Sequence, residues 1–133
     1  MFEKHSYNLF SCYQDYVIEW PFFITLSGNL QIGSFNLQRY KSGQHFQKAH
    51  TERISLNSLH RVFAWMTCLN NVDIKDGGST LFSHFGLKIQ LTKGLTLIWP
   101  AECTHAYKGN LLKAGSKYII TGWMHFPNNP NSL

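Results

Sequence analysis

His50 and Glu52 are the residues of this sequence whose types and spacing most directly point to chemistry. Side chains two residues apart on an extended segment point to the same face. An imidazole and a carboxylate from one short piece of chain can therefore converge on a single metal ion. A lone His-x-Glu pattern also arises in chains without a metal, so the prediction depends on a further ligand.

His105 is the candidate for that further ligand. It follows an apolar segment, residues 95–99, and a turn-like segment, residues 100–104. Two histidines and one carboxylate form a facial triad, which leaves three coordination positions open for a chelating cosubstrate and O₂. A structural zinc site would instead fill its fourth position with a protein ligand, and Cys103 is available for that role. The residues alone leave iron and zinc both open.

The composition is that of one core-rich domain. Its 133 residues are 44% hydrophobic and 15% aromatic, and only 14% are charged, against about 25% in typical domains. These proportions exclude a disordered chain and a long solvated helical rod. The net charge of +5 is spread over twelve Lys and Arg residues with no run of three, so it indicates ordinary solubilising charge and does not point to a nucleic-acid partner.

The cysteine pattern and the hydropathy indicate the cellular compartment of the protein. Cys12, Cys68 and Cys103 are odd in number and lack CxxC spacing, which argues against a disulfide framework or a zinc knuckle. The first residues lack the pattern of a signal peptide. No apolar run approaches the ~18 residues of a transmembrane helix. We therefore expect a soluble, cytoplasmic protein with no membrane partner.

The pattern of apolar residues predicts one helix followed by short strands. An apolar stripe with helical spacing ends at Pro21 and predicts a covering helix. Frequent turn signals then separate short segments rich in β-branched and aromatic residues, which favours an all-β sandwich or barrel. The stripe is Leu9, Tyr13, Tyr16, Val17 and Trp20, and the expected strands are residues 30–40, 61–69, 80–82, 87–91, 95–99 and 118–126. We expect one domain, with a helical cover (1–23), a β core (24–126) and a tail (127–133).

Alternate residues of the segment 117–124 mix polar and apolar side chains on one face and are mostly apolar on the other, which predicts burial on both sides. An inward-facing lysine is unfavourable unless an anion joins it, and otherwise a surface or edge position is expected. Trp65, Trp99 and Trp123 are expected in the core. Gly77 and Gly78 are expected in a turn, where glycine tolerates positive φ.

An ordered series of short motifs covers about two thirds of the chain. The motifs are Gln38-Arg39-Tyr40, Gly43, His50-Thr51-Glu52, Arg61, Leu69-Asn70, Gly77-Gly78-Ser79-Thr80-Leu81-Phe82, Lys93-Gly94, Leu97-Ile98-Trp99-Pro100, His105, Gly115-Ser116-Lys117-Tyr118 and Thr121-Gly122-Trp123. In this order and spacing they resemble the prolyl 4-hydroxylase-like group of 2-oxoglutarate/Fe(II)-dependent oxygenases. The resemblance implies a mainly β fold, a double-stranded β-helix or jelly roll with the metal near its open end.

The resemblance also implies roles for individual residues. His50 and Glu52 correspond to the proximal iron ligands and His105 to the distal ligand, and these three would be the catalytic centre. Lys117 corresponds to the basic residue that pairs with the distal carboxylate of 2-oxoglutarate, and Tyr40 to a tyrosine that lines the cosubstrate pocket. Thr121, four residues after Lys117, is expected on the same side of the strand as a hydroxyl partner for that carboxylate.

Three features depart from the group's pattern. Glu52 stands where most relatives have aspartate, so its reach is one methylene longer. Cys68 stands where a tyrosine often precedes Leu-Asn, which removes a hydroxyl from the expected cosubstrate pocket. The N-terminal region is short for the group, so the chain is a truncated member, a fragment, or a domain that completes its fold by oligomerising.

The expected function is hydroxylation of a C–H bond by a dioxygenase that uses Fe(II), 2-oxoglutarate and O₂, with ascorbate as a further cofactor. The resemblance suggests a prolyl residue of a peptide or protein as substrate, in preference to nucleic acid. The alternative is a cupin-like jelly roll that binds a metal or small ligand without oxygenase activity. An inward-pointing Lys117 discriminates the two. A structural β-sandwich with solvated His and Glu side chains is the third reading.

Overall fold

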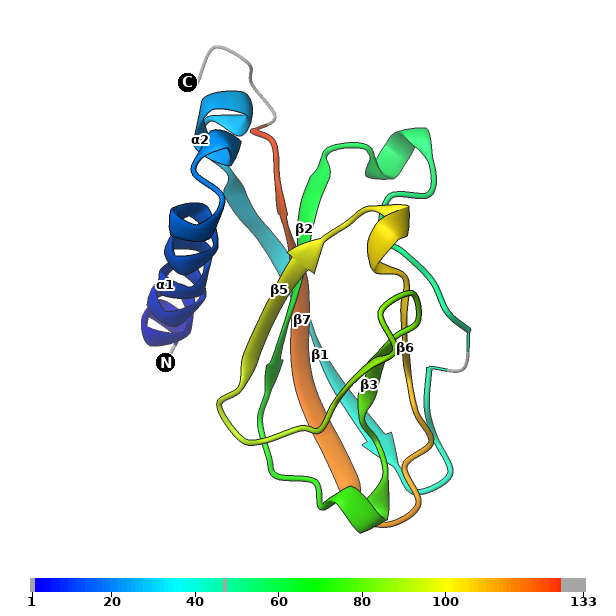
Figure 1. Ribbon diagram of the computed structural model, residues 1–133. Helices are drawn as coiled ribbons and strands as arrows, with labels where there is room; N and C mark the ends of the chain where they lie inside the picture. Colours follow the sequence, from blue (N-terminus) through cyan, green and yellow to red (C-terminus); the bar gives the residue numbers. More distant parts are fainter. Residues whose placement is uncertain (1, 47, 128–133) are drawn as a thin grey trace.

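The computed structural model describes residues 2–46 and 48–127. Helices lead the chain and short strands follow (Figure 1). The helices are α1 (Phe2–Glu19) and α2 (Phe22–Ser27), and the 3₁₀ helices are η1 (Leu56–Ser58), η2 (Ile74–Asp76) and η3 (Cys103–His105). The strands are β1 (Gln31–Lys41), β2 (Arg61–Cys68), β3 (Thr80–Phe82), β4 (Leu87–Ile89), β5 (Thr96–Pro100), β6 (Tyr107–Gly109) and β7 (Ser116–His125). Apart from Pro127, the expected tail 127–133 lies outside the described residues.

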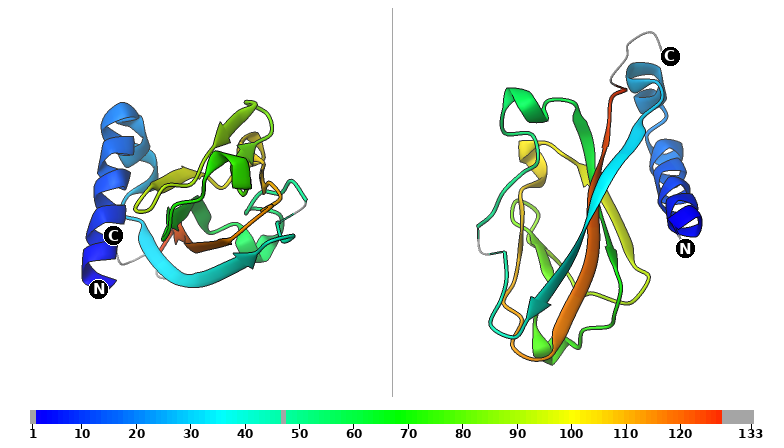
Figure 2. Two further views of the ribbon diagram at one scale, coloured as in Figure 1. Left: turned by 90° about the horizontal axis from the view of Figure 1, so that it is seen from below. Right: turned by 180° about the vertical axis from the view of Figure 1, so that it is seen from behind.

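The strands form two antiparallel sheets. One sheet has the order β1-β7-β2-β5 and the other the order β4-β3-β6. Figures 1 and 2 show the smaller sheet on one side of the larger sheet and the two helices on its other side. The mainly β fold of jelly-roll type with an N-terminal helix is therefore confirmed.

The side-chain alternation of β2 divides the core into two layers. Phe63 and Trp65 belong to a buried cluster on the helix side of the larger sheet, together with Leu9 of α1. Ala64 and Met66 belong to the cluster between the sheets. Successive strand residues point to opposite faces, so a strand that is apolar at every position is covered on both sides. β7 is also covered on both sides, with Ile119 in the cluster between the sheets and Met124 in the cluster on the helix side, which confirms its predicted burial on both faces.

The predicted covering helix is present, with one difference at its end. Leu9, Tyr13 and Val17 are buried against the larger sheet, as the apolar stripe predicts. Trp20 is 59% exposed and lies beyond the end of α1. Pro21 then precedes a second helix, α2, which the sequence did not predict. Among the described residues, no helix is both long and apolar enough to span a bilayer.

The expected strands agree with the structure to within about two residues at their ends. The strand that sequence reasoning missed is β6, which pairs with β3 in the smaller sheet. It has three residues and follows directly on the 3₁₀ turn η3, so it is too short to give a period. This short strand proves decisive for the site because it carries Tyr107.

Candidate active site

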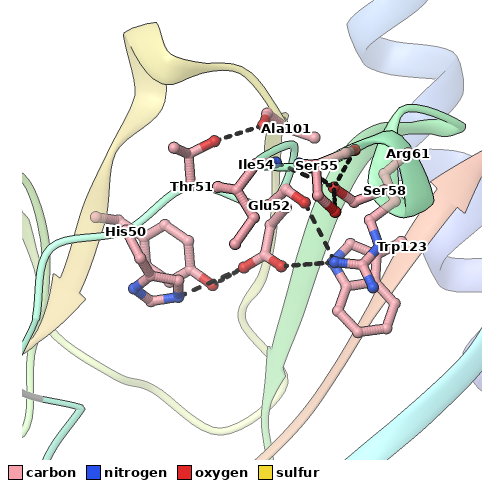
Figure 3. A network of polar contacts seen from close by, with 10 residues as sticks. His50, Thr51, Glu52, Ile54, Ser55, Ser58, Arg61, Ala101 and Trp123 are labelled. Atoms are coloured by element: carbon pink, nitrogen blue, oxygen red, sulfur yellow. Dashed lines mark hydrogen bonds and ion pairs between the residues drawn. The ribbon is translucent and has the colours of Figure 1, made fainter.

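Glu52 is the centre of a cluster of polar contacts (Figure 3). The hydroxyl of Tyr107 donates a hydrogen bond to Glu52 Oε1 at 2.5 Å, and the indole Nε1 of Trp123 donates to Oε2 at 2.8 Å. His50 Nε2 lies 3.5 Å from Oε1, and Arg61 Nη1 lies 3.6 Å from Oε2. The carboxylate is only 12% exposed, so protein groups surround most of it.

The cluster keeps Glu52 ionised. Burial alone would raise the pKa of this carboxyl, but hydrogen bonds from His50, Tyr107 and Trp123 outweigh burial and lower it to about 2. Burial also acts on His50, where it lowers the imidazole pKa. The contact with Glu52 outweighs it there too, so the pKa of His50 rises. Burial and the negative charge of Glu52 both raise the pKa of Tyr107, so its phenol stays protonated and remains a donor.

Backbone pairing explains why Tyr107 faces His50. The two residues form an isolated antiparallel bridge in which each N–H donates to the other's carbonyl at 3.0 Å. Residues directly opposite each other in such a pair place their side chains on the same face. Their rings accordingly lie 4.3 Å apart between centroids. Glu52, two residues after His50, points to the same region, as its spacing predicts.

His105 lies apart from this pair. It ends the 3₁₀ helix η3, where its N–H donates to the carbonyl of Glu102. Its ring packs against Phe85 with centroids 5.0 Å apart, and its Nδ1 lies 2.9 Å from the hydroxyl of Thr104. Within residues 2–46 and 48–127, no three His, Cys, Asp or Glu side chains are placed to hold a metal ion. The structure thus brings His50 and Glu52 together but does not bring His105 to them.

The backbone conformation of residues 103–107 explains why His105 does not reach His50 and Glu52. Residues 105 and 107 would share a face only if the chain between residues 102 and 107 were extended. The turn of η3 rotates His105 away before the chain becomes extended at Tyr107. The first side chain that reaches the His50–Glu52 pair from this segment is therefore that of Tyr107.

A cavity of about 230 Å³ joins the Glu52 cluster to Lys117. It is smaller than the ~300–1,000 Å³ of drug-sized sites, which suits a small ligand. The cavity is lined by all the site residues expected from the sequence except His105. These are Tyr40, His50, Glu52, Lys117 and Thr121, and Tyr107 joins them.

Lys117 points inward and is 5% exposed. Its Nζ donates a hydrogen bond to the carbonyl of Gly78 at 3.0 Å and lies 5.2 Å from the centre of the Tyr40 ring. Among the described residues, no Asp or Glu forms an ion pair with it. Burial lowers its pKa, because water no longer solvates the ammonium group.

Two glycines leave space around this ammonium group. A Cβ at Gly109 would come within 3.9 Å of Lys117 Nζ, and a Cβ at Gly78 would meet Leu112 at 2.9 Å. Gly78 has a φ of +70° and Gly77 a φ of +75°, which confirms the predicted turn glycines. Tyr40 lies opposite Lys117 in the β1–β7 register, and Thr121 lines the same cavity.

The model of the 2OG-Fe(II) oxygenase superfamily matches residues 35–125, more than half of the sequence. The chain belongs to this superfamily. Membership confirms the family expected from the motifs, and it implies Fe(II) as the cofactor and 2-oxoglutarate and O₂ as the cosubstrates of the family's chemistry.

Solved structures share the fold. A viral collagen prolyl hydroxylase from Paramecium Bursaria Chlorella virus-1, in complex with 2-oxoglutarate, aligns with a TM-score of 0.68 at 18% identity over 90% of this chain and 72% of its own. A Trichoplax adhaerens prolyl hydroxylase in complex with a hypoxia inducible factor peptide aligns with a TM-score of 0.58 at 18% identity, over 74% of this chain and 47% of its own.

A cupin from Bacteroides fragilis also aligns, with a TM-score of 0.51 at 10% identity over 71% of this chain and 67% of its own. No curated protein sequence matches the chain. The family match supports a 2-oxoglutarate-dependent hydroxylase and does not favour the cupin-like alternative, and the solved structures show the shared fold.

The residues that face the cavity do not fit an Fe(II) facial triad. His50 and Glu52 supply two of the three side chains that such a site needs. The third neighbour is the phenol of Tyr107, which donates a hydrogen bond to the carboxylate. Both oxygens of Glu52 therefore already accept hydrogen bonds from the protein.

The same cavity does fit the diacid. A buried ammonium group that has no acidic partner within the described part of the chain, in a space bordered by Gly78 and Gly109, is complementary to a carboxylate. Sequence reasoning found Lys117 through the family resemblance, and it missed Tyr107. Trp123 packs against the core cluster, as expected, and also donates a hydrogen bond to Glu52. No pattern signals Tyr107, because only the bridge to His50 reveals its position.

Proposed function

We propose that this member of the superfamily is a 2-oxoglutarate-binding protein of the hydroxylase class and that Lys117 receives the distal carboxylate of the diacid. The observation that carries the proposal is the burial of Lys117 at 5% exposure without an acidic partner among the described residues. A buried ammonium group is stable only where an anion or polar atoms replace its lost hydration. The single hydrogen bond to the Gly78 carbonyl leaves further donors of Nζ available.

Tyr40 and Thr121 would complete the diacid site. The Tyr40 ring lies beside the ammonium group, and its hydroxyl donates to Gln38 at 3.0 Å, which fixes the ring as one wall of the cavity. The Thr121 hydroxyl lines the same cavity and would donate to the carboxylate. Binding would then need no large rearrangement, since the pocket already exists.

Hydroxylation of a C–H bond is the reaction that the family supports. A prolyl residue in a peptide is the first substrate to test, with ascorbate in the assay, because a neighbour of similar fold is a prolyl hydroxylase bound to a peptide. Iron held by His50, Glu52 and His105 in that reaction would require a different arrangement of these residues from the one described here. His105 would first have to leave Phe85 and displace Tyr107.

Calorimetric titration with 2-oxoglutarate tests the proposal. Lys117→Met should weaken binding by at least about tenfold, because a charge-assisted hydrogen bond in a buried site contributes about 1.5–3 kcal/mol. Lys113→Met is the matched control, because Lys113 is exposed and four residues away in the sequence. Equal binding in both variants would refute the assignment of Lys117. Release of succinate in the presence of Fe(II) measures hydroxylase chemistry separately.

A further inference from the structure

The hydroxyl of Tyr107 lies against Glu52 Oε1, the carboxylate oxygen that also faces His50 Nε2. Its oxygen lies 2.5 Å from Oε1, at the short end of the O–H···O range, so it occupies space beside the carboxylate that an ion bound to Oε1 at about 2.0–2.2 Å would also need. A tyrosine reaches further from the backbone than a histidine at the same position. A histidine at residue 107 would leave room for an ion between its ring and Glu52, whereas the phenol fills that room with its own hydroxyl.

The remaining contacts of Glu52 involve its second oxygen, Oε2. Trp123 donates a hydrogen bond to Oε2, and the guanidinium group of Arg61 lies 3.6 Å from the same oxygen. Arg61 is itself held over the Trp123 ring, with 3.8 Å between Cζ and the ring centre. A positive charge is thus already fixed beside the carboxylate, and it would repel a divalent ion at that oxygen.

The arrangement is fixed by the backbone. The reciprocal hydrogen bonds between His50 and Tyr107 hold the phenol on the face of the imidazole. His105 is held elsewhere by the turn of η3 and by its contact with Phe85. Exchange of Tyr107 for His105 would therefore require both a broken bridge and an unwound turn.

We infer that Tyr107 takes the place of the metal ion in this chain, and that the cavity binds a five-carbon dicarboxylate without a metal. The position of Tyr107 stands on the geometry of the Glu52 cluster, whereas the dicarboxylate rests on the proposed function. In a metal-dependent site the 2-oxo acid end is chelated, so the oxo group strengthens binding. Here Lys117 provides the main attraction, and 2-oxoglutarate and glutarate should bind with similar affinity.

Metal binding is measured with Co(II), whose visible absorption reports coordination by protein ligands without any turnover. The wild-type protein and Tyr107→Phe should give no coordinated Co(II) spectrum. Tyr107→His should bind Co(II) at least about 100-fold more tightly than wild type, since even residues that only orient a metal ligand change affinity 10–100-fold. Circular dichroism checks that each variant is folded.

Co(II) binding by the wild type as tight as that of Tyr107→His would overturn the inference. A folded Tyr107→His that gains no Co(II) affinity would also overturn it, because Tyr107 would then not be what fills the metal position. If Tyr107→His does not fold, the wild-type titration alone decides between a metal-free and a metal-binding site.

Diacid binding is measured calorimetrically on the wild type in EDTA, with 2-oxoglutarate and glutarate as probes. Affinities within about tenfold of each other support the inference, since that range is about 1.4 kcal/mol. Binding of 2-oxoglutarate that appears only after Co(II) is added would overturn it. If neither acid binds but the Co(II) results are as predicted, the proposed binding of 2-oxoglutarate is refuted, whereas the inference that Tyr107 takes the place of the metal ion is still supported.

Discussion

His50 and Tyr107 lie directly opposite each other, joined by two backbone hydrogen bonds of 3.0 Å. This pairing places the phenol beside the imidazole and within 2.5 Å of the Glu52 carboxylate. The consequence is a cavity with two different ends. One end is closed by hydrogen bonds among protein groups, and the other holds the buried ammonium group of Lys117, which has no acidic partner among the described residues.

Tyr107→Phe should lower the free energy of unfolding by about 2 kcal/mol, because a hydrogen bond to a charged group contributes about 1.5–3 kcal/mol. The substitution removes only the hydroxyl and creates no large cavity. Urea unfolding measures the change. Tyr7→Phe is the control, because Tyr7 is 75% exposed. If the two variants are equally stable, the contact between Tyr107 and Glu52 does not stabilise the folded protein.

Glu52→Gln should also destabilise the protein by about 2 kcal/mol. Glutamine lacks the negative charge, and its NH₂ group would face the hydrogen-bond donors of Tyr107 and Trp123. An empty metal site predicts the opposite sign, since removal of an unneeded ligand charge relieves strain and usually raises stability. Chemical unfolding therefore separates the two accounts. Glu102→Gln is the matched control, because Glu102 forms an exposed ion pair with Arg53, for which a change below about 1 kcal/mol is expected.

Lys117→Met should raise the free energy of unfolding of the ligand-free protein by about 1 kcal/mol, because it replaces a buried charge by an apolar side chain of similar size. With a saturating concentration of the diacid, wild type should become more stable than Lys117→Met. Wild type gains about 2.7 kcal/mol at a ligand concentration of 100 times Kd, and the variant gains little. A ligand-free variant that is clearly less stable than wild type would contradict this account.

The stability difference between wild type and Lys117→Met should depend on pH. Burial lowers the pKa of Lys117 below its usual 10.5 in the folded state. Between that lowered pKa and 10.5 the unfolded chain binds more protons than the folded chain, so the stability of wild type rises with pH. Below this window both states are charged and the contribution is constant. Urea unfolding from neutral to alkaline pH should show the advantage of the variant shrinking, and a constant difference would argue against a buried ammonium group.

Leu9→Ala should destabilise the protein by about 3 kcal/mol, because it leaves a cavity between α1 and the larger sheet. Leu9 is 1% exposed and belongs to the same buried cluster as Phe63 and Trp65. Phe10→Ala is the control, because Phe10 is 47% exposed and a change of about 0.5 kcal/mol or less is expected. Equal stability of the two variants would mean that the helix does not contribute to the core.

Helices and strands whose apolar residues repeat at regular intervals could be predicted from the sequence. The apolar stripe of α1 and the doubly buried strand around Lys117 are both of this kind, because each repeats its pattern over several residues. The meeting of His50 with Glu52 follows from their spacing of two. The inward direction of Lys117 is expected only through the family resemblance, because a lysine is otherwise expected at the surface or at a sheet edge.

The identity of the third side chain beside His50 and Glu52 could not be predicted. His105 and Tyr107 are two residues apart, so their spacing alone would place both side chains on the same face of an extended segment. The turn of η3 and the three-residue strand β6 decide between them, and both are too short to leave a periodic signal. Their geometry depends on pairing with distant segments, β3 and the chain at His50.

A crystal structure of the wild-type protein grown with both 2-oxoglutarate and excess Co(II) would show whether Tyr107 or a metal ion lies beside Glu52. We expect a carboxylate of the diacid within hydrogen-bond distance of Lys117 Nζ, no anomalous signal between His50 and Glu52, and the Tyr107 hydroxyl still bonded to Glu52. A cobalt ion held by His50 and Glu52, with Tyr107 moved aside, would contradict this expectation.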